Sequence, residues 1–88
     1  MDHILINVKS FKIIAPYTLQ IFFENEEDRI INFEPVLYGH YYEPLRNISF
    51  FNQVKIDPEV NTLVWPNDAD FDPAVLYNWH NGDQIQAH

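Results

Sequence analysis

The clearest hydrophobic pattern in the chain lies between residues 18 and 24, where Leu19, Ile21 and Phe23 occupy every second position. Apolar side chains at this spacing predict a β-strand with one buried face. The pattern breaks after residue 24 and resumes at residues 29–33. The two segments are therefore predicted to pair as an antiparallel hairpin.

Two further apolar runs come before this strand, at residues 4–8 and 11–14. Their alternating positions are out of phase, and a bulge near Lys9 and Ser10 would bring both runs onto one face. A turn at residues 15–17 then leads into the next strand. The first third of the chain is therefore predicted to form a three-stranded antiparallel meander.

The period of two disappears between residues 34 and 53, where Pro35, Gly39 and Pro44 permit only short helical turns. The placement of Pro35 and Gly39 predicts a one-turn helix over residues 35–38. The apolar residues expected to anchor this segment to the sheet are Tyr42, Leu45, Phe50 and Phe51.

A second hairpin is predicted from residues 54–56 and 62–65, which are apolar and β-prone and flank a turn that begins at Asp57. A helix over residues 73–79 follows, because Asp72 suits the position before a helix and proline suits the first position. The helix residues spaced to share an apolar face are Val75, Leu76 and Trp79.

Together these elements predict an α+β fold. We expect a small antiparallel sheet of about five strands, built from the meander and the hairpin, with short helical turns and a C-terminal helix. The length of 88 residues fits one domain. That domain is expected to span residues 1–80, and residues 81–88 are expected to form a flexible tail.

Composition narrows the classes of function. Thirteen acidic residues against five basic ones give a formal net charge of −8, which repels a phosphate backbone and attracts basic protein surfaces. We therefore expect a protein partner, with a basic surface, and no direct binding of nucleic acid. The chain has no cysteine, so thiol chemistry is not expected. No apolar run approaches the roughly 18 residues that span a bilayer, and the expected location is the cytoplasm.

Three aspartates, Asp68, Asp70 and Asp72, alternate in the turn before the last helix. In the favoured interpretation Asp72 caps that helix, Asp70 bonds to the turn backbone and Asp68 is solvated. The alternative is a metal-assisted hydrolase in which Asp68 and Asp70 hold a divalent cation. Glu34 or His40 would complete that site. No motif of recognised catalytic spacing is present, so we expect neither catalytic residues nor a cofactor.

Two clusters are candidate interaction surfaces. Tyrosine rings with polar tips are typical interface anchors, and the alternative is packing beneath a loop. Acidic residues at the first hairpin tip either dock a basic partner or form a solvated turn that discourages aggregation. The two clusters are Tyr38, Tyr41 and Tyr42, and Glu26, Glu27 and Asp28.

The order of these elements, with the run Trp-Pro-Asn-Asp-Ala-Asp at residues 65–70, resembles the bacterial family called domain of unknown function 2442. In that family glycine is usual where this chain has Asp68, and an Asp-Gly turn is common where it has Glu26 and Glu27. The residues that carry the resemblance most specifically are Trp65, Pro66, Asn67, Asp70, Asp72, Leu76 and Tyr77.

The resemblance implies a compact α+β domain without an established activity. Many members are encoded beside another small protein, which implies a toxin–antitoxin-like pair. We therefore interpret the chain as a non-enzymatic protein-interaction or regulatory module, the partner half of such a pair. A homodimeric structural module that pairs through an exposed edge strand is a further alternative, beside the metal-assisted hydrolase.

Overall fold

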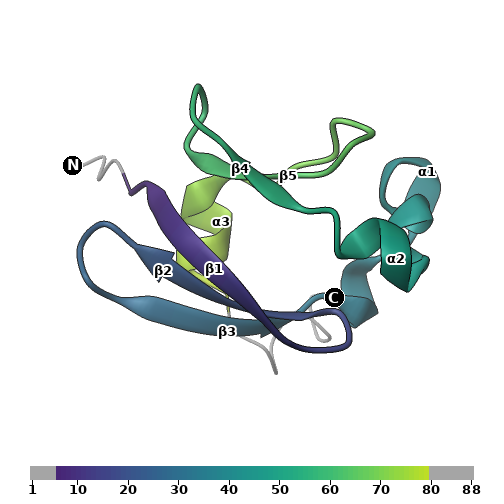
Figure 1. Cartoon of the computed structure of the whole chain (residues 1–88), viewed down its shortest axis with the longest axis horizontal. Coiled ribbons are helices and arrows are strands. Elements are labelled where there is room, and N and C mark those ends of the chain that lie inside the picture. The colour runs from purple at the N-terminus through teal and green to yellow at the C-terminus, as the bar shows by residue number, and fades with distance from the viewer. Residues whose placement is uncertain (1–5, 80–88) are drawn as a thin grey trace.

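The computed structural model describes residues 6–79, and its five strands form two antiparallel sheets (Figure 1). The strands are β1 Val8–Ala15, β2 Thr18–Phe23, β3 Asp28–Asn32, β4 Lys55–Asp57 and β5 Thr62–Val64. The first three lie in chain order in one sheet, and β4 pairs with β5 in the other. The predicted α+β fold, with a meander and a hairpin, is confirmed, and its strands are divided between two sheets. The predicted tail, residues 81–88, lies outside the described residues.

The predicted bulge is present in β1. Val8 and Ser10 lie opposite consecutive residues of β2, so Lys9 is an extra residue on β1. The bulge restores the alternation of inward and outward side chains. As a result, Phe11 lies opposite Ile21 on the inner face of the sheet.

The hydrophobic core lies between the inner face of the three-stranded sheet, the β4–β5 hairpin and the helical turns. In β2 the predicted alternation is confirmed, because Leu19, Ile21 and Phe23 are at most 1% exposed. Burial of large apolar side chains is the main stabilising contribution to folding. The other core residues at most 1% exposed are Ile31, Phe33, Leu37, Leu45, Phe51, Leu63, Trp65, Ala69 and Leu76.

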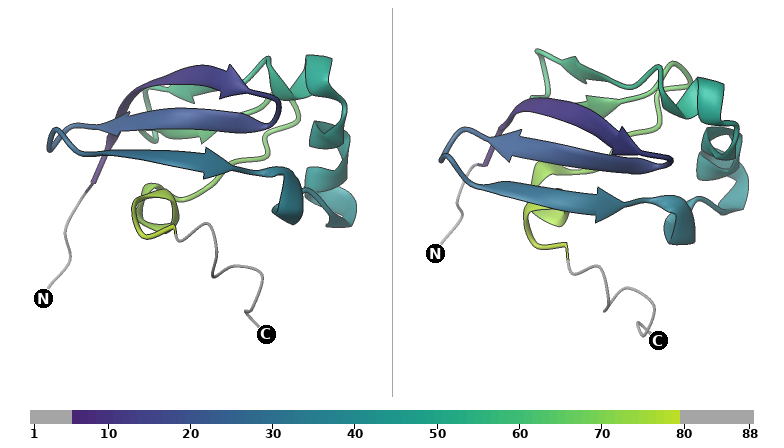
Figure 2. Two further views of the ribbon diagram at one scale, coloured as in Figure 1. Left: turned by 90° about the horizontal axis from the view of Figure 1, so that it is seen from below. Right: turned by 60° about the horizontal axis from the view of Figure 1, so that its bottom comes forward.

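The helices are short and lie at two places around the sheet. Figure 2 shows α3, Pro73–Tyr77, beside β3, and the turns of the middle segment together at one end of the sheet. Those turns are η1 Glu34–Val36, α1 Gly39–Tyr42, η2 Glu43–Arg46 and α2 Ile48–Phe51. Within residues 6–79, none of the helices is long and apolar enough to cross a membrane.

The helix predicted over residues 35–38 is wrong in extent. Pro35 opens a 3₁₀ turn that ends at Val36, and Leu37 has already left the helical conformation with φ −85° and ψ 70°. The side chain of Leu37 is fully buried, so the chain turns toward the core at this residue. The predicted anchors are confirmed as residues of the core or packed against it: Tyr42, Leu45, Phe50 and Phe51.

The C-terminal helix begins as predicted and is shorter than predicted. Asp72 Oδ1 accepts a hydrogen bond from the N–H of Ala74 at 2.8 Å, and Pro73 takes the first helical position. Leu76 is the buried residue of this helix. Val75 is 49% exposed, so the predicted shared apolar face is wrong at that residue.

Candidate functional site

The Trp-Pro-Asn-Asp-Ala-Asp turn is closed by its own backbone. The N–H of Trp65 donates to the carbonyl oxygen of Ala69 at 2.9 Å. The N–H of Asp68 donates to the carbonyl oxygen of Trp65 at 2.8 Å. Asn67 Oδ1 accepts a further bond from the N–H of Ala69 at 3.1 Å. The side chain of Asn67 therefore has the role that the sequence suggested for Asp70. Asp68 has φ +70°, a left-handed conformation that favours glycine.

Two adjacent tyrosines of α1 form hydrogen bonds to the backbone of this turn. The hydroxyl of Tyr41 donates a hydrogen bond to the carbonyl oxygen of Asp68. The hydroxyl of Tyr42 donates to the carbonyl oxygen of Asp70 at 2.7 Å. In return, Asn67 Nδ2 donates to the carbonyl oxygen of Tyr41 at 3.2 Å. The structure thus joins the tyrosine segment to the acidic turn, two features that the sequence left apart.

Tyr42 is the structural member of the tyrosine cluster. It is half-buried, and its ring stacks on Phe71 with centroids 4.8 Å apart and an interplanar angle of 17°. Burial raises the pKa of Tyr42 above its ordinary value, and the nearby charges of Asp70 and Tyr41 raise it further. The phenol therefore stays protonated and able to donate its hydrogen bond.

Tyr38 and Tyr41 present their rings to solvent, with exposures of 70% and 44%. The turn that Tyr41 contacts carries the exposed carboxylates of Asp68 and Asp70, and exposed Glu43 directly follows α1. Aromatic ring faces and carboxylates are the groups that bind lysine and arginine side chains. We name this surface the tyrosine–aspartate end, made of Tyr38, Tyr41, Glu43, Asp68 and Asp70.

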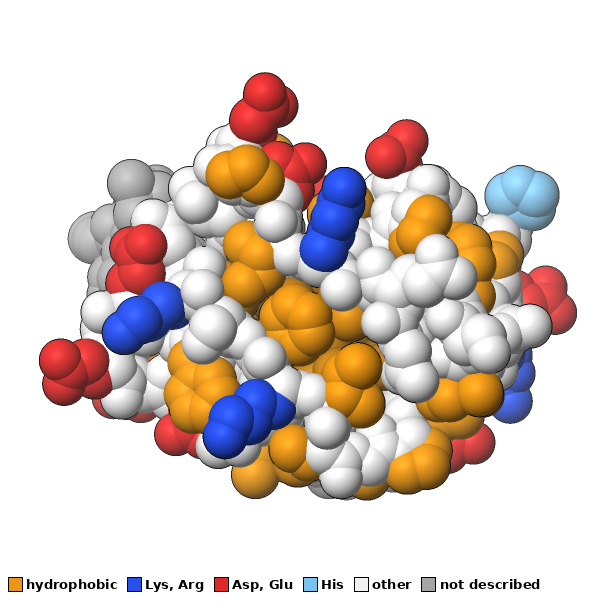
Figure 3. Space-filling model, in the orientation of Figure 1, with side chains coloured by type: hydrophobic (Ala, Val, Ile, Leu, Met, Phe, Trp, Pro, Cys, Tyr) orange, Lys and Arg blue, Asp and Glu red, His pale blue; other side chains and the backbone are white. Residues whose placement is uncertain are grey.

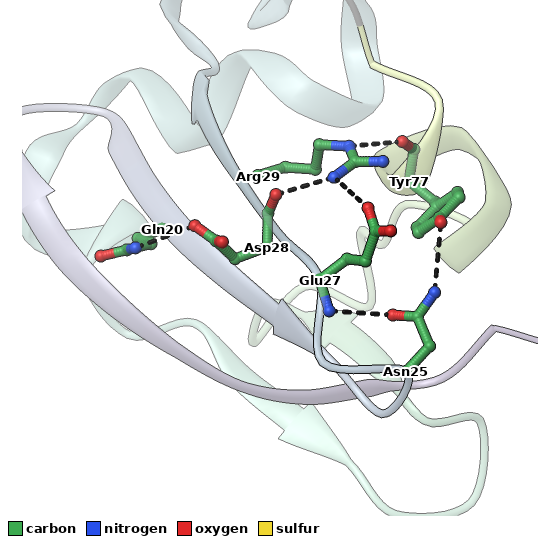
Figure 4. A network of polar contacts seen from close by, with 6 residues as sticks. All are labelled: Gln20, Asn25, Glu27, Asp28, Arg29 and Tyr77. Carbon is green, nitrogen blue, oxygen red and sulfur yellow. Dashed lines mark hydrogen bonds and ion pairs between the residues drawn. The ribbon is translucent and has the colours of Figure 1, made fainter.

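The acidic tip of the β2–β3 hairpin is tied to α3 through Arg29 (Figure 4). Arg29 Nε donates to the carbonyl oxygen of Tyr77 at 2.8 Å, and the guanidinium carbon lies 4.4 Å from the centre of the Tyr77 ring. Arg29 Nη1 also pairs with Glu27 Oε1 at 3.2 Å. Asn25 adds a second link, because its Oδ1 accepts from the N–H of Glu27 and its Nδ2 donates to the Tyr77 hydroxyl, both at 3.1 Å.

The three acidic residues predicted as a docking surface at this tip therefore differ in their surroundings. Glu27 belongs to the Arg29 network, and Asp28 Oδ2 accepts a hydrogen bond from Gln20 Nε2 at 2.9 Å. Glu26 is exposed and has φ +73°. In Figures 1 and 2 the tip and the helical turns that carry the tyrosines lie at opposite ends of the molecule. The two candidate surfaces are therefore separate.

The aspartates of the turn lack the surroundings of a metal centre. Among the residues that the structure describes, no group of three or more aspartate, glutamate or histidine side chains could hold a metal ion. Neither Glu34 nor His40 forms such a group with Asp68 and Asp70. What the two aspartates supply here is carbonyl oxygens to the tyrosine hydroxyls and carboxylates to the surface.

Sequence reasoning missed Arg29, which holds the hairpin tip in place. Arg29 lies opposite the fully buried Ile21 on the inner side of β3. A charged residue at an inward position of an apolar alternation was the available signal. The residues of the family resemblance that are buried or hydrogen-bonded through their side chains are Trp65, Asn67, Asp72, Leu76 and Tyr77.

Comparison with known proteins gives a family. No curated protein and no solved structure matches the chain. One family profile matches residues 8–82, a segment that begins with β1 and contains both the hairpin tip and the tyrosine–aspartate end. The resemblance noted in the sequence is thereby confirmed, and the chain belongs to the family described as Protein of unknown function (DUF2442).

Proposed function

We propose that this protein is a non-enzymatic protein-interaction module whose tyrosine–aspartate end binds a basic surface of a partner protein. The observation that carries the proposal is the exposed ring of Tyr41, whose hydroxyl bonds to the turn that carries the exposed carboxylates of Asp68 and Asp70. The more exposed Tyr38 directly precedes α1, the helix that contains Tyr41. A lysine or arginine of the partner would lie against a ring face while its charge meets a carboxylate.

The hydrogen bonds within this end support the proposal because they fix its shape before binding. The hydroxyls of Tyr41 and Tyr42 are bonded to the turn, and Asn67 bonds back to Tyr41. A surface held in its bound shape loses less conformational entropy on association. Aromatic side chains at such a surface are also the usual centres of binding energy.

Charge supports a basic partner in particular. The formal net charge of −8 accelerates the approach of a positively charged protein, and added salt weakens that attraction. A regulatory role follows from this proposal. The chain would be the acidic half of a toxin–antitoxin-like pair and would cover the basic surface of its companion, as the family resemblance implies.

The test is capture of partner proteins from the native cell by the tagged chain and by two variants of equal charge. The first variant is Tyr38→Ser with Asp68→Asn and Asp70→Asn, which removes an exposed ring and two carboxylates. The control is Glu26→Gln with Glu59→Gln, two exposed acids outside this end. Each capture is run at about 50 mM and about 500 mM salt.

The proposal predicts one specific protein that the wild-type chain and the control recover at low salt. The first variant recovers little of it, and high salt reduces its recovery by the wild-type chain. Equal recovery by all three proteins would place the binding surface elsewhere. Consistent recovery of no specific protein would count against an interaction module.

A further inference from the structure

The outer edge of β1 is a short stretch of strand with open backbone groups. β1 is the edge strand of the three-stranded sheet, and its register shifts leave a regular stretch from Ser10 to Ile13. Within residues 6–79, its one backbone hydrogen bond away from β2 runs from the N–H of Val8 to the carbonyl oxygen of Asn61, at 3.0 Å. An edge of this kind is a template for an added strand.

Apolar side chains line this edge. Phe11 and Ile13 lie on the inner face of the sheet, opposite Ile21 and Leu19. The rest of the protein covers these two side chains only in part: Phe11 is half-buried and Ile13 is 45% exposed. Ile56 of neighbouring β4 is half-buried as well. Figure 3 shows hydrophobic side chains together in the middle of this face of the molecule.

The same place holds every lysine of the chain. Lys9 and Lys12 belong to β1 and Lys55 belongs to β4, whereas β1 contains no acidic residue. Figure 3 shows basic side chains around the central hydrophobic group, with acidic side chains beside some of them and along the rim. A protein of net charge −8 therefore carries a locally basic and apolar strip on this face. We name it the lysine edge, made of Lys9, Phe11, Lys12, Ile13, Lys55 and Ile56.

We propose that the lysine edge binds an extended segment of another protein in which carboxylates alternate with apolar side chains. Along β1 the inward Phe11 and Ile13 flank the outward Lys12, which lies opposite Gln20. A strand added at this edge would present side chains with the same period of two. Its apolar residues would cover Phe11 and Ile13, and its acidic residue would pair with Lys12 across the strands.

A second copy of this chain fits the edge poorly. Two-fold pairing of β1 with β1 would bring Lys9 and Lys12 of one copy near the lysines of the other, and like charges on adjacent strands are destabilising. The lysines therefore disfavour self-association and favour an acidic segment, which is how charge gives specificity. This surface is distinct from the tyrosine–aspartate end, which attracts partners of the opposite charge.

The experiment uses fluorescein-labelled, end-capped peptides of about eight residues and the whole chain, with binding followed by fluorescence anisotropy. The probe alternates glutamate with valine. One comparison peptide has lysine in place of glutamate. The other has proline in place of two valines, which removes backbone donors and keeps the charge. The proposal predicts binding of the probe at least about tenfold tighter than either comparison peptide.

Protein variants locate the binding. The double variant Lys12→Gln with Lys55→Gln is expected to bind the probe with an affinity lower by about tenfold or more. Ile13→Ser, which leaves the charge unchanged, is a second variant that should also lower the affinity for the probe. The matched control is Ser49→Asp with Ala74→Glu, which changes the net charge by the same amount at two exposed sites on α2 and α3. Circular dichroism confirms that each variant is folded.

Two results would overturn the proposal. The first is equal affinity of the probe and its proline version, because binding would then depend on charge alone. The second is no saturable binding of the probe up to about millimolar concentration. If light scattering then shows the Lys12→Gln and Lys55→Gln variant to dimerise, the lysines serve only to prevent self-pairing.

Discussion

The indole Nε1 of Trp65 donates a hydrogen bond to the backbone carbonyl oxygen of Phe51 at 2.8 Å, and both side chains are at most 1% exposed. The same oxygen accepts a bond from the N–H of Val54 at 3.2 Å. One carbonyl at the end of α2 thus ties the chain before β4 to the residue after β5. This contact positions the acidic turn, which begins at Trp65.

Replacing Trp65 should therefore cost more stability than replacing the other tryptophan. Trp65→Phe removes a buried hydrogen bond and part of a packed ring, and we expect a loss of about 2 kcal/mol in the free energy of unfolding. Trp79 is half-buried against Phe33 and Phe71, and its Nε1 has no hydrogen-bond partner in the described part of the chain. Trp79→Phe should cost about 1 kcal/mol or less. Urea unfolding measures both, and an equal or reversed order would contradict the role given to the Trp65 bond.

Stability should fall at alkaline pH because of Tyr42. Its folded pKa lies above the ordinary value of 10.0, so above pH 10 the unfolded chain releases this proton before the folded chain does. The contribution of protonated Tyr42 to the free energy of unfolding is therefore complete below about pH 10, and it is lost as pH rises through the pKa of Tyr42 in the folded state. Tyr42→Phe should remove this part of the alkaline loss and cost about 1 kcal/mol at neutral pH through its lost bond to Asp70.

The control for that prediction is Tyr38→Phe, at a residue that is 70% exposed. It should change the unfolding free energy by less than about 0.5 kcal/mol and leave the alkaline decline intact. Urea unfolding from about pH 7 to about pH 11 compares the three proteins. A decline of the same size in Tyr42→Phe and in the wild-type chain would show that Tyr42 is not its source.

Replacing Glu26 with glycine should stabilise the protein. Its φ of +73° places a side chain in the left-handed region, where glycine has no steric penalty. We expect Glu26→Gly to stabilise the protein by about 0.5 kcal/mol. Glu59→Gly, in the exposed β4–β5 turn and without positive φ, should destabilise it by about 0.5–1 kcal/mol. Thermal unfolding gives both signs, and a loss in both variants would refute the argument from backbone strain.

The acidic turn should not bind divalent cations tightly. Calorimetric titration with about 10 mM Mg²⁺ or Mn²⁺ is expected to give only the heat of dilution. Asp68→Asn with Asp70→Asn should behave in the same way, because these carboxylates have no third ligand among residues 6–79. Saturable heat in the wild-type chain that disappears in the double variant would revive the metal-assisted hydrolase.

Local signals in the sequence were sufficient for most of the fold. The period of two in β2, the phase shift at Lys9 and the aspartate and proline at the start of α3 each concern residues close together in the chain. The middle segment was harder. Pro35 and Gly39 indicated one helical turn, but burial of Leu37 ended it early. Tertiary packing overrode the local preference at that residue.

The candidate site depended on contacts that local patterns do not encode. Tyr41 and Asp68 are 27 residues apart in sequence, and their hydrogen bond forms only when α1 packs against the turn after β5. Residue types marked both segments as candidates, but no periodicity joins them. The same limit applies to Arg29 and Tyr77, whose contact spans 48 residues.

The most direct test of the proposed interaction surface uses the two acidic regions of the molecule as internal competitors. The hairpin tip carries Glu24, Glu26, Glu27 and Asp28, so charge alone would favour it. The tyrosine–aspartate end has fewer carboxylates and two exposed rings. A basic side chain that needs both an aromatic face and a carboxylate would choose that end.

Nuclear magnetic resonance of the ¹⁵N-labelled chain, titrated with a capped peptide of about eight residues that alternates arginine and serine, decides between them. The proposal predicts the largest amide shifts at residues 38–43 and 68–70. Larger shifts at residues 24–28 than at the tyrosine–aspartate end would contradict it.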